Sequence, residues 1–203
     1  MKLSIISLEH VFPGESELLT AFFQKEIEHI YIRKPNSTEQ EIRDMINKIP
    51  EEYHHRIIVQ NHFNLIRQFN LNGVLLSRRF PVAPNMEKSK GITKAVACSR
   101  VEDLGKYINF QNILFGPLFD PSSSSMLKNG FSLEKLREAK ERNVINSKVV
   151  AMGGICTETI LFAKSIGFER VATWSSLWGN YSKDKDKFVV LKRLDEMIHA
   201  TEA

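Results

Sequence analysis

Eight short apolar runs, separated by segments of helical periodicity, constrain the fold of this chain more than any other feature. The runs are rich in β-branched and aliphatic residues, and most are apolar nearly throughout, which is typical of parallel strands covered on both faces. The predicted strands are Lys2–Ser7, His29–Arg33, Arg56–Gln60, Gly73–Ser77, Lys94–Ser99, Asn112–Phe119, Lys148–Met152 and Arg170–Ser176. The repeating unit is therefore a strand followed by a helix.

The helical segments carry start signals and apolar stripes. At the start of the second helix, Ser37 with Gln40 or Thr38 with Glu41 forms a capping box. In the last helix, one stripe is expected to contain Phe188, Leu191, Leu194 and Ile198.

The number of strand–helix units predicts an α/β fold, a (β/α)8 TIM barrel that forms a single domain over residues 1–203. The weakest unit lies between the fourth and fifth strands, where Pro81 and Pro84 leave room for a turn or two of helix. A doubly wound open sheet is the alternative. Right-handed crossovers repeated this many times favour closure into a barrel.

Composition and charge exclude several classes of partner. The net charge of +4 comes from 28 basic and 24 acidic residues that are interspersed, so nucleic acid is not an expected partner. We expect no membrane segment, because no apolar run approaches the roughly 18 residues that span a bilayer. The short apolar stretch before Glu9 does not fit a signal peptide, which predicts a cytoplasmic protein. Cys98 and Cys156 lack metal-binding spacing and are expected to be reduced thiols.

The segment Lys148–Ile155 ends the seventh predicted strand with Gly153 and Gly154, just before a helix start at Thr157. Paired glycines expose backbone N–H groups and let another group come close, which suits a phosphate near a helix N-terminus. A tight turn that binds nothing is the alternative. The loops after strands seven and eight of a (β/α)8 barrel commonly hold phosphate, and this position favours a phosphate site.

Six segments keep the order and spacing of a known family. They are Ile30–Lys34, Ile58–Asn61, Asn72–Leu76, Phe115–Phe119, Ala151–Ile155 and Val171–Ser176. In these segments the chain resembles the thiamine-phosphate synthase and thiazole tautomerase (TenI) family of small (β/α)8 barrels. The synthase of that family couples a pyrimidine pyrophosphate with a thiazole phosphate and releases pyrophosphate.

The resemblance implies a small phosphorylated heterocycle of the thiazole phosphate type as partner, and it leaves a homodimer open. The residues implied to hold the phosphate through their backbone amides are Gly153, Gly154, Ser175 and Ser176. Trp174 or Trp178 would line the ring, with ordinary packing as the alternative for both.

The pyrophosphate half of the site departs from the family pattern. Arg33 is kept after the second strand, but Pro35 stands where the family has lysine, with Lys34 as a partial substitute. The family's Thr-x-Thr-Lys loop after the sixth strand is replaced by a serine run in which Ser123 offers a hydroxyl, with Lys128 nearby.

The carboxylates that hold magnesium in the family are also replaced. The Asn-Asp pair after the third strand reads Asn61-His62, and Phe80 stands at the position of the second aspartate. Mg2+ requires oxygen ligands, which neither phenylalanine nor histidine supplies. No cofactor is firmly implied, and Mg2+ is expected only if synthase chemistry is retained with Arg78 and Arg79 replacing part of its charge.

These departures favour the thiazole tautomerase branch, which transfers protons at a thiazole carboxylate phosphate and needs no metal. The predicted catalytic residues are His62, Asp120 and Arg33, with Asn61 beside the substrate. His62 is the preferred base because histidine titrates near neutral pH, although it also fits a helix N-terminus without a catalytic role. The other candidates for the acid or base are Glu9, Cys98 and Ser99.

Two alternatives to the tautomerase remain open. One is a thiamine-phosphate synthase with an altered pyrophosphate site, and the other is a non-catalytic sensor of the thiamine pathway. Solvated surface positions are expected for the remaining histidines, His10, His29, His54, His55 and His199.

Overall fold

The (β/α)8 barrel predicted from the sequence is confirmed. In the computed structural model, which describes residues 1–76, 91–120, 127–128 and 130–203, eight strands are hydrogen-bonded in sequence order around a closed barrel. The strands are β1 (Lys2–Ile6), β2 (Ile30–Ile32), β3 (Ile57–Gln60), β4 (Gly73–Leu76), β5 (Thr93–Cys98), β6 (Asn112–Phe115), β7 (Val149–Met152) and β8 (Arg170–Thr173).

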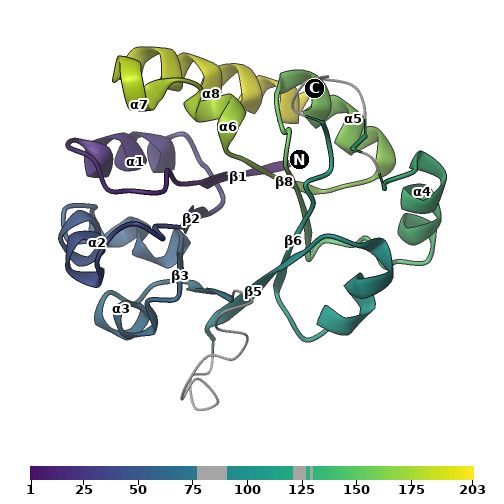
Figure 1. The fold of residues 1–203 in the computed structure, drawn as a ribbon, viewed down its shortest axis with the longest axis horizontal. Helices are drawn as coiled ribbons and strands as arrows, with labels where there is room; N and C mark the ends of the chain where they lie inside the picture. Colours follow the sequence, from purple (N-terminus) through teal and green to yellow (C-terminus); the bar gives the residue numbers. More distant parts are fainter. Residues whose placement is uncertain (77–90, 121–126, 129) are drawn as a thin grey trace. The chain divides into compact units, whose positions relative to one another are not determined.

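Helices follow most of the strands (Figure 1). The α-helices are α1 (Glu15–Gln24), α2 (Glu39–Ile46), α3 (Phe63–Gln68), α4 (Leu133–Glu141), α5 (Thr157–Ile166), α6 (Ser175–Trp178), α7 (Tyr181–Asp184) and α8 (Lys187–Glu202). The 3-10 helices are η1 (Glu51–Arg56) and η3 (Val101–Tyr107). In the described part of the chain, no helix has the length and apolar character needed to cross a bilayer.

The chain forms two compact units. One unit is Ile5–Val96, and the other joins Met1–Ser4 to Ala97–Ala203. Both β1 and β5 supply residues to each unit. The single domain expected from the sequence remains a prediction.

In the Ile5–Val96 unit, β1 to β4 and the first part of β5 pair in parallel, with Ile30 opposite Ile57 and Val59 opposite Val74. The predicted capping box of the second helix is confirmed for one of its two alternatives. The Thr38 hydroxyl accepts the N–H of Glu41 at 3.2 Å, and the Glu41 carboxylate accepts the N–H of Thr38 at 2.7 Å. This exchange satisfies donors that the first turn of a helix leaves open.

In the Ala97–Ala203 unit, β6, β7 and β8 pair in parallel and α5 packs against α8 (Figure 1). Two predicted strands end earlier than expected. The strand from Asn112 stops at Phe115, because Gly116 adopts a positive φ of 154° and Pro117 has no N–H for the ladder. The strand from Arg170 stops at Thr173, because Ser175 already begins α6.

The predicted stripe of the last helix is wrong at its first residue, Phe188, whereas Leu194 is fully buried and Leu191 and Ile198 are half-buried. Phe188 is 75% exposed, although the sequence stripe placed it in the core. The side chains of α8 that are buried are Val190, Leu194, Met197, Ala200 and Thr201. The helix begins at Lys187 and buries the stripe that starts one turn further on, which leaves the first turn in solvent.

Candidate functional site

The loop after β7 depends on glycine at two successive positions. Gly153 and Gly154 have φ angles of 84° and 67°, in the left-handed region that disfavours residues with a side chain. A Cβ atom at Gly153 would lie 2.4 Å from the Cα of Pro117, and one at Gly154 would lie 2.8 Å from the Cβ of Phe119. Glycine is therefore required by the turn and by its packing on the loop after β6, whether or not a ligand binds.

The hydrogen bonds of this loop leave amide donors available. The Gly153 carbonyl accepts the N–H of Phe119 at 3.1 Å, and the Gly154 carbonyl accepts the Thr159 hydroxyl at 2.8 Å. The N–H groups of Gly153 and Gly154 donate to no acceptor within the described residues. Unpaired backbone amides are strong donors that require a partner such as water or an anion.

The loop after β8 lies against the same segment. Thr173 is fully buried, and its hydroxyl donates to the Ile155 carbonyl at 3.1 Å. Ser175 and Ser176 follow at once, and their N–H groups also have no acceptor in the part of the chain that the structure describes. The two glycines and the two serines that the sequence predicted as a phosphate site thus follow the paired strands β7 and β8, in which Met152 lies opposite Ala172. We call these four residues the amide cradle.

Asp120 lies next to the amide cradle. It is half-buried and follows Phe119, whose N–H bonds to the Gly153 carbonyl. Phe119 also forms an isolated antiparallel bridge with Leu127, and the N–H of Lys128 donates to the Leu118 carbonyl at 2.9 Å. Lys128 is therefore held beside this loop, as the sequence suggested. Ser123 lies outside the described residues, and so do Arg78, Arg79 and Phe80.

In the Ile5–Val96 unit, the side chain of Lys34 forms a buried ion pair. Its ammonium group lies 2.5 Å from the Glu15 carboxylate and donates to the His10 carbonyl at 2.9 Å, and both charged side chains are fully buried. Burial lowers the pKa of Lys34 and raises the pKa of Glu15, while their attraction opposes both shifts. A phosphate-binding role for Lys34 is thus disfavoured, because its charge already neutralises Glu15.

Arg33 is more exposed to solvent than Lys34. It is half-buried, and its backbone N–H donates to the Ser7 hydroxyl at 3.0 Å, which fixes the chain where it leaves β2. Arg33 is therefore the cation of the Arg33-Lys34 pair that can reach an anion. Its predicted role in catalysis stays a prediction.

His62 lies at the start of α3, as the non-catalytic interpretation expected, and its side chain caps no helical amide. Its Nδ1 atom lies 3.8 Å from a carboxylate oxygen of Glu39. Burial lowers the pKa of His62, and Glu39 opposes that shift. The lowered pKa favours the neutral imidazole, which is the state that a general base requires. Asn61, which precedes it, adopts a left-handed φ of 65°.

The described residues do not provide a magnesium site of the family type. Among them, no three His, Cys, Asp or Glu side chains gather closely enough to hold a metal ion. Glu39, the carboxylate beside His62, also accepts a hydrogen bond from Arg43 at 3.0 Å.

Cys98 is a poor candidate for the base. Burial is the largest cause that raises the pKa of the Cys98 thiol, which also donates to the Arg100 carbonyl at 3.2 Å, so the thiol stays protonated at neutral pH. Ser99 lines a cavity of about 320 Å³ together with Arg100 and Lys135.

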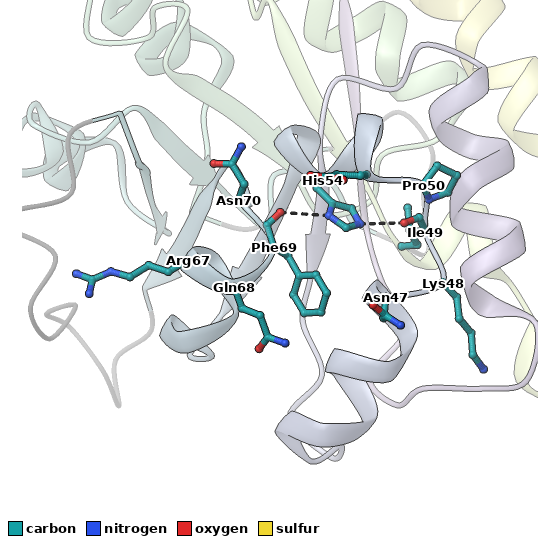
Figure 2. A pocket seen from close by; sticks show the side chains of 10 residues that line it. Asn47, Lys48, Ile49, Pro50, His54, Arg67, Gln68, Phe69 and Asn70 are labelled. Carbon is teal, nitrogen blue, oxygen red and sulfur yellow. Dashed lines mark hydrogen bonds between the residues drawn. The ribbon is translucent and has the colours of Figure 1, made fainter.

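A larger cavity, of about 660 Å³, lies elsewhere in the Ile5–Val96 unit, between the ends of α2 and α3. Figure 2 shows His54, one of the lining residues, between Ile49 and Phe69. His54 was expected at the surface but is only 6% exposed, and its ring nitrogens lie 2.9 Å from the Ile49 carbonyl and 3.2 Å from the Phe69 carbonyl. His54 therefore links the segment that follows α2 to the C-terminal end of α3 through hydrogen bonds. None of the predicted site residues lines this cavity.

Comparison with solved structures supports the family suggested by the sequence. The chain is similar to thiamine phosphate pyrophosphorylase from Bacteroides thetaiotaomicron, with 26% identity, a TM-score of 0.88 and coverage of 100% of this chain and 98% of that chain. The resemblance to the thiamine-phosphate synthase family is confirmed. The sequence matches no protein-family model and no curated protein.

Two more distant structures share the fold. Thiamine phosphate pyrophosphorylase from Pyrococcus furiosus has 18% identity and a TM-score of 0.75, with coverage of 99% of this chain and 95% of that chain. A 3-hexulose-6-phosphate synthase has 14% identity and a TM-score of 0.63, with coverage of 98% and 99%. At these identities the likeness concerns the barrel alone.

Proposed function

We propose that this protein binds a thiazole phosphate through the amide cradle formed by Gly153, Gly154, Ser175 and Ser176. The observation that carries the proposal is the set of backbone N–H groups in the two loops that donate to no acceptor among the described residues. Such donors suit the oxygens of a phosphate, and a helix that follows directly adds the positive end of its dipole. Here α5 begins at Thr157, three residues after Gly154.

We infer that the reaction is proton transfer of the thiazole tautomerase type. A base removes a proton from one carbon of the thiazole carboxylate phosphate, the electron pair shifts through the conjugated system, and an acid returns a proton at another carbon. Atoms and electrons balance without any co-reactant. Asp120 is the titratable side chain that best fits this role, because the chain places it directly after Phe119, which contacts the cradle.

His62 is the second candidate for the acid or base. Its lowered pKa favours the neutral imidazole, and the nearby Glu39 carboxylate stabilises the imidazolium that proton uptake creates. The tautomerase reaction is favoured over the synthase reaction because the latter must stabilise a departing pyrophosphate. Lys34, a candidate cation for that task, is bound to Glu15 instead.

Specific observations also favour two other functions, a synthase and a non-catalytic sensor. The similarity to a thiamine phosphate pyrophosphorylase over the full chain and the retained Arg33 favour the synthase. The engagement of Lys34 in the core and the replaced magnesium carboxylates favour a sensor that binds without turnover.

The proposed reaction can be tested by incubating the protein with the thiazole carboxylate phosphate in D2O and following the proton spectrum. We expect isomerisation, with deuterium entering the product, at the same rate with Mg2+ and with EDTA. Formation of thiamine phosphate from the pyrimidine pyrophosphate and thiazole phosphate, only with Mg2+ present, would establish the synthase instead. Saturable binding without either reaction would establish the sensor.

A further inference from the structure

The two tryptophans of the chain lie four residues apart after β8 but in opposite environments. Trp178 is 1% exposed, and its ring centroid lies 5.9 Å from that of Tyr181. Trp174 is 38% exposed, and its side chain makes no ring contact or hydrogen bond with another described residue. Trp178 is thus a packing residue, whereas Trp174 has an accessible ring and an indole N–H without an acceptor among the described residues.

The main chain fixes Trp174 beside the amide cradle. Its carbonyl accepts the N–H groups of Leu177 and Trp178, both at 3.1 Å. The residue before it, Thr173, is bonded to the Ile155 carbonyl, and the residue after it, Ser175, belongs to the cradle. In the chain, Trp174 therefore follows the residue that is bonded to the loop after β7 and precedes the two serines.

Exposure alone does not single out Trp174, because other large apolar side chains are also exposed. Phe188, Ile108 and Leu161 lie on or next to helices, and each is more exposed than Trp174. Trp174 differs from them because it directly precedes Ser175 and Ser176, whose N–H groups have no acceptor in the described part of the chain. An accessible aromatic side chain in the same loop as backbone donors supplies the two kinds of group that recognise an aromatic phosphate ester, one apolar and one polar.

We propose that Trp174 is the ring-binding residue of this site, and that its indole packs on the heteroaromatic ring of an ester whose phosphate is held by the amide cradle. The inference rests on the proposed function and adds a specificity determinant to it. Inorganic phosphate and non-aromatic esters gain nothing from the indole, so Trp174 selects aromatic phosphate esters. A well-placed aromatic pair accounts for a difference in affinity of about three- to tenfold.

The test uses the full chain labelled with 5-fluorotryptophan, which gives two fluorine resonances that Trp174→Phe assigns. Thiazole phosphate is expected to shift the Trp174 resonance in a saturable way and to leave the Trp178 resonance in place. By calorimetry, Trp174→Ala should weaken thiazole phosphate about three- to tenfold. The same variant should bind inorganic phosphate and ribose 5-phosphate as the unsubstituted protein does.

The outcomes separate this inference from the proposed function. If thiazole phosphate leaves the Trp174 resonance unchanged, or Trp174→Ala binds it as tightly as the unsubstituted protein, Trp174 is not the ring-binding residue and the cradle is unaffected. An equal loss of affinity for all three ligands would assign Trp174 a structural role and overturn the inference. If no phosphate binds to the unsubstituted protein, both proposals fail.

Discussion

Replacing Lys34 by methionine should lower the free energy of unfolding by about 3–5 kcal/mol, measured by urea denaturation at pH 7. In the unsubstituted protein, the Lys34 ammonium group lies 2.5 Å from the Glu15 carboxylate. The substitution removes this group and leaves the carboxylate buried without a counter-charge. One oxygen of that carboxylate already has no hydrogen-bond partner among the described residues. Lys48→Met, at an exposed position of the same unit, is the matched control and should change stability by less than about 0.5 kcal/mol.

Removing both charges should restore most of the lost stability. The double variant Lys34→Met with Glu15→Leu leaves no charge in the site, and well-packed apolar side chains of similar volume commonly replace a buried ion pair at little cost. A double variant as unstable as Lys34→Met alone would show that the loss came from packing and not from the unpaired carboxylate.

The stability deficit of Lys34→Met should depend on pH. Burial raises the pKa of Glu15 above its ordinary value of 4.5, and Lys34 is the main group that opposes this shift. Without Lys34 the folded-state pKa rises further, so the protonated carboxyl is favoured in the folded protein. Such a group contributes its full stability below the unfolded pKa and loses it as pH rises. The deficit should therefore be smallest near pH 4 and grow toward pH 8.

The second large effect is expected at Asp120. Asp120→Asn should lower the turnover of the thiazole carboxylate phosphate by about 10²–10⁴-fold, the usual contribution of a general acid or base. The affinity for thiazole phosphate should stay within about threefold, because the amides that we propose to bind the phosphate are untouched. Turnover is measured by the proton spectrum in D2O, and affinity by calorimetry.

Asp44→Asn, on the exposed face of α2, is the matched control for Asp120→Asn and should leave turnover unchanged. If Asp120→Asn keeps full turnover while His62→Ala loses it, the base is His62. Full turnover in both variants would contradict the assignment of the acid and base to these two residues.

The parts of the fold that local patterns encode could be predicted from the sequence. The eight strands were placed to within a few residues, because runs of β-branched residues report burial on both faces of a sheet. The capping box of Thr38 and Glu41 was also recognisable, because its two partners are three residues apart. The early end of β6 at Gly116-Pro117 was missed, although proline is a poor strand residue.

Interactions between residues far apart in the chain could not be predicted. Lys34 and Glu15 are 19 residues apart, and each alone indicates a solvated charge. His54 lies in a polar segment, and its burial depends on the carbonyls of Ile49 and Phe69 at two helix ends. For the candidate site, the Gly-Gly pair predicted where the loop after β7 lies in the sequence. The packing of these two glycines on Pro117 and Phe119 could be seen only in the structure.

The central claim is that the backbone amides of the cradle bind the phosphate of a thiazole ester, and amide NMR tests it most directly. Titrating the nitrogen-15-labelled protein with thiazole phosphate should move the amide resonances of Gly153, Gly154, Ser175 and Ser176 together, with one saturating curve. Gly105, where the structure shows open space around the glycine, should stay in place. Cradle resonances that do not move, or shifts confined to the cavity around His54, would contradict the account.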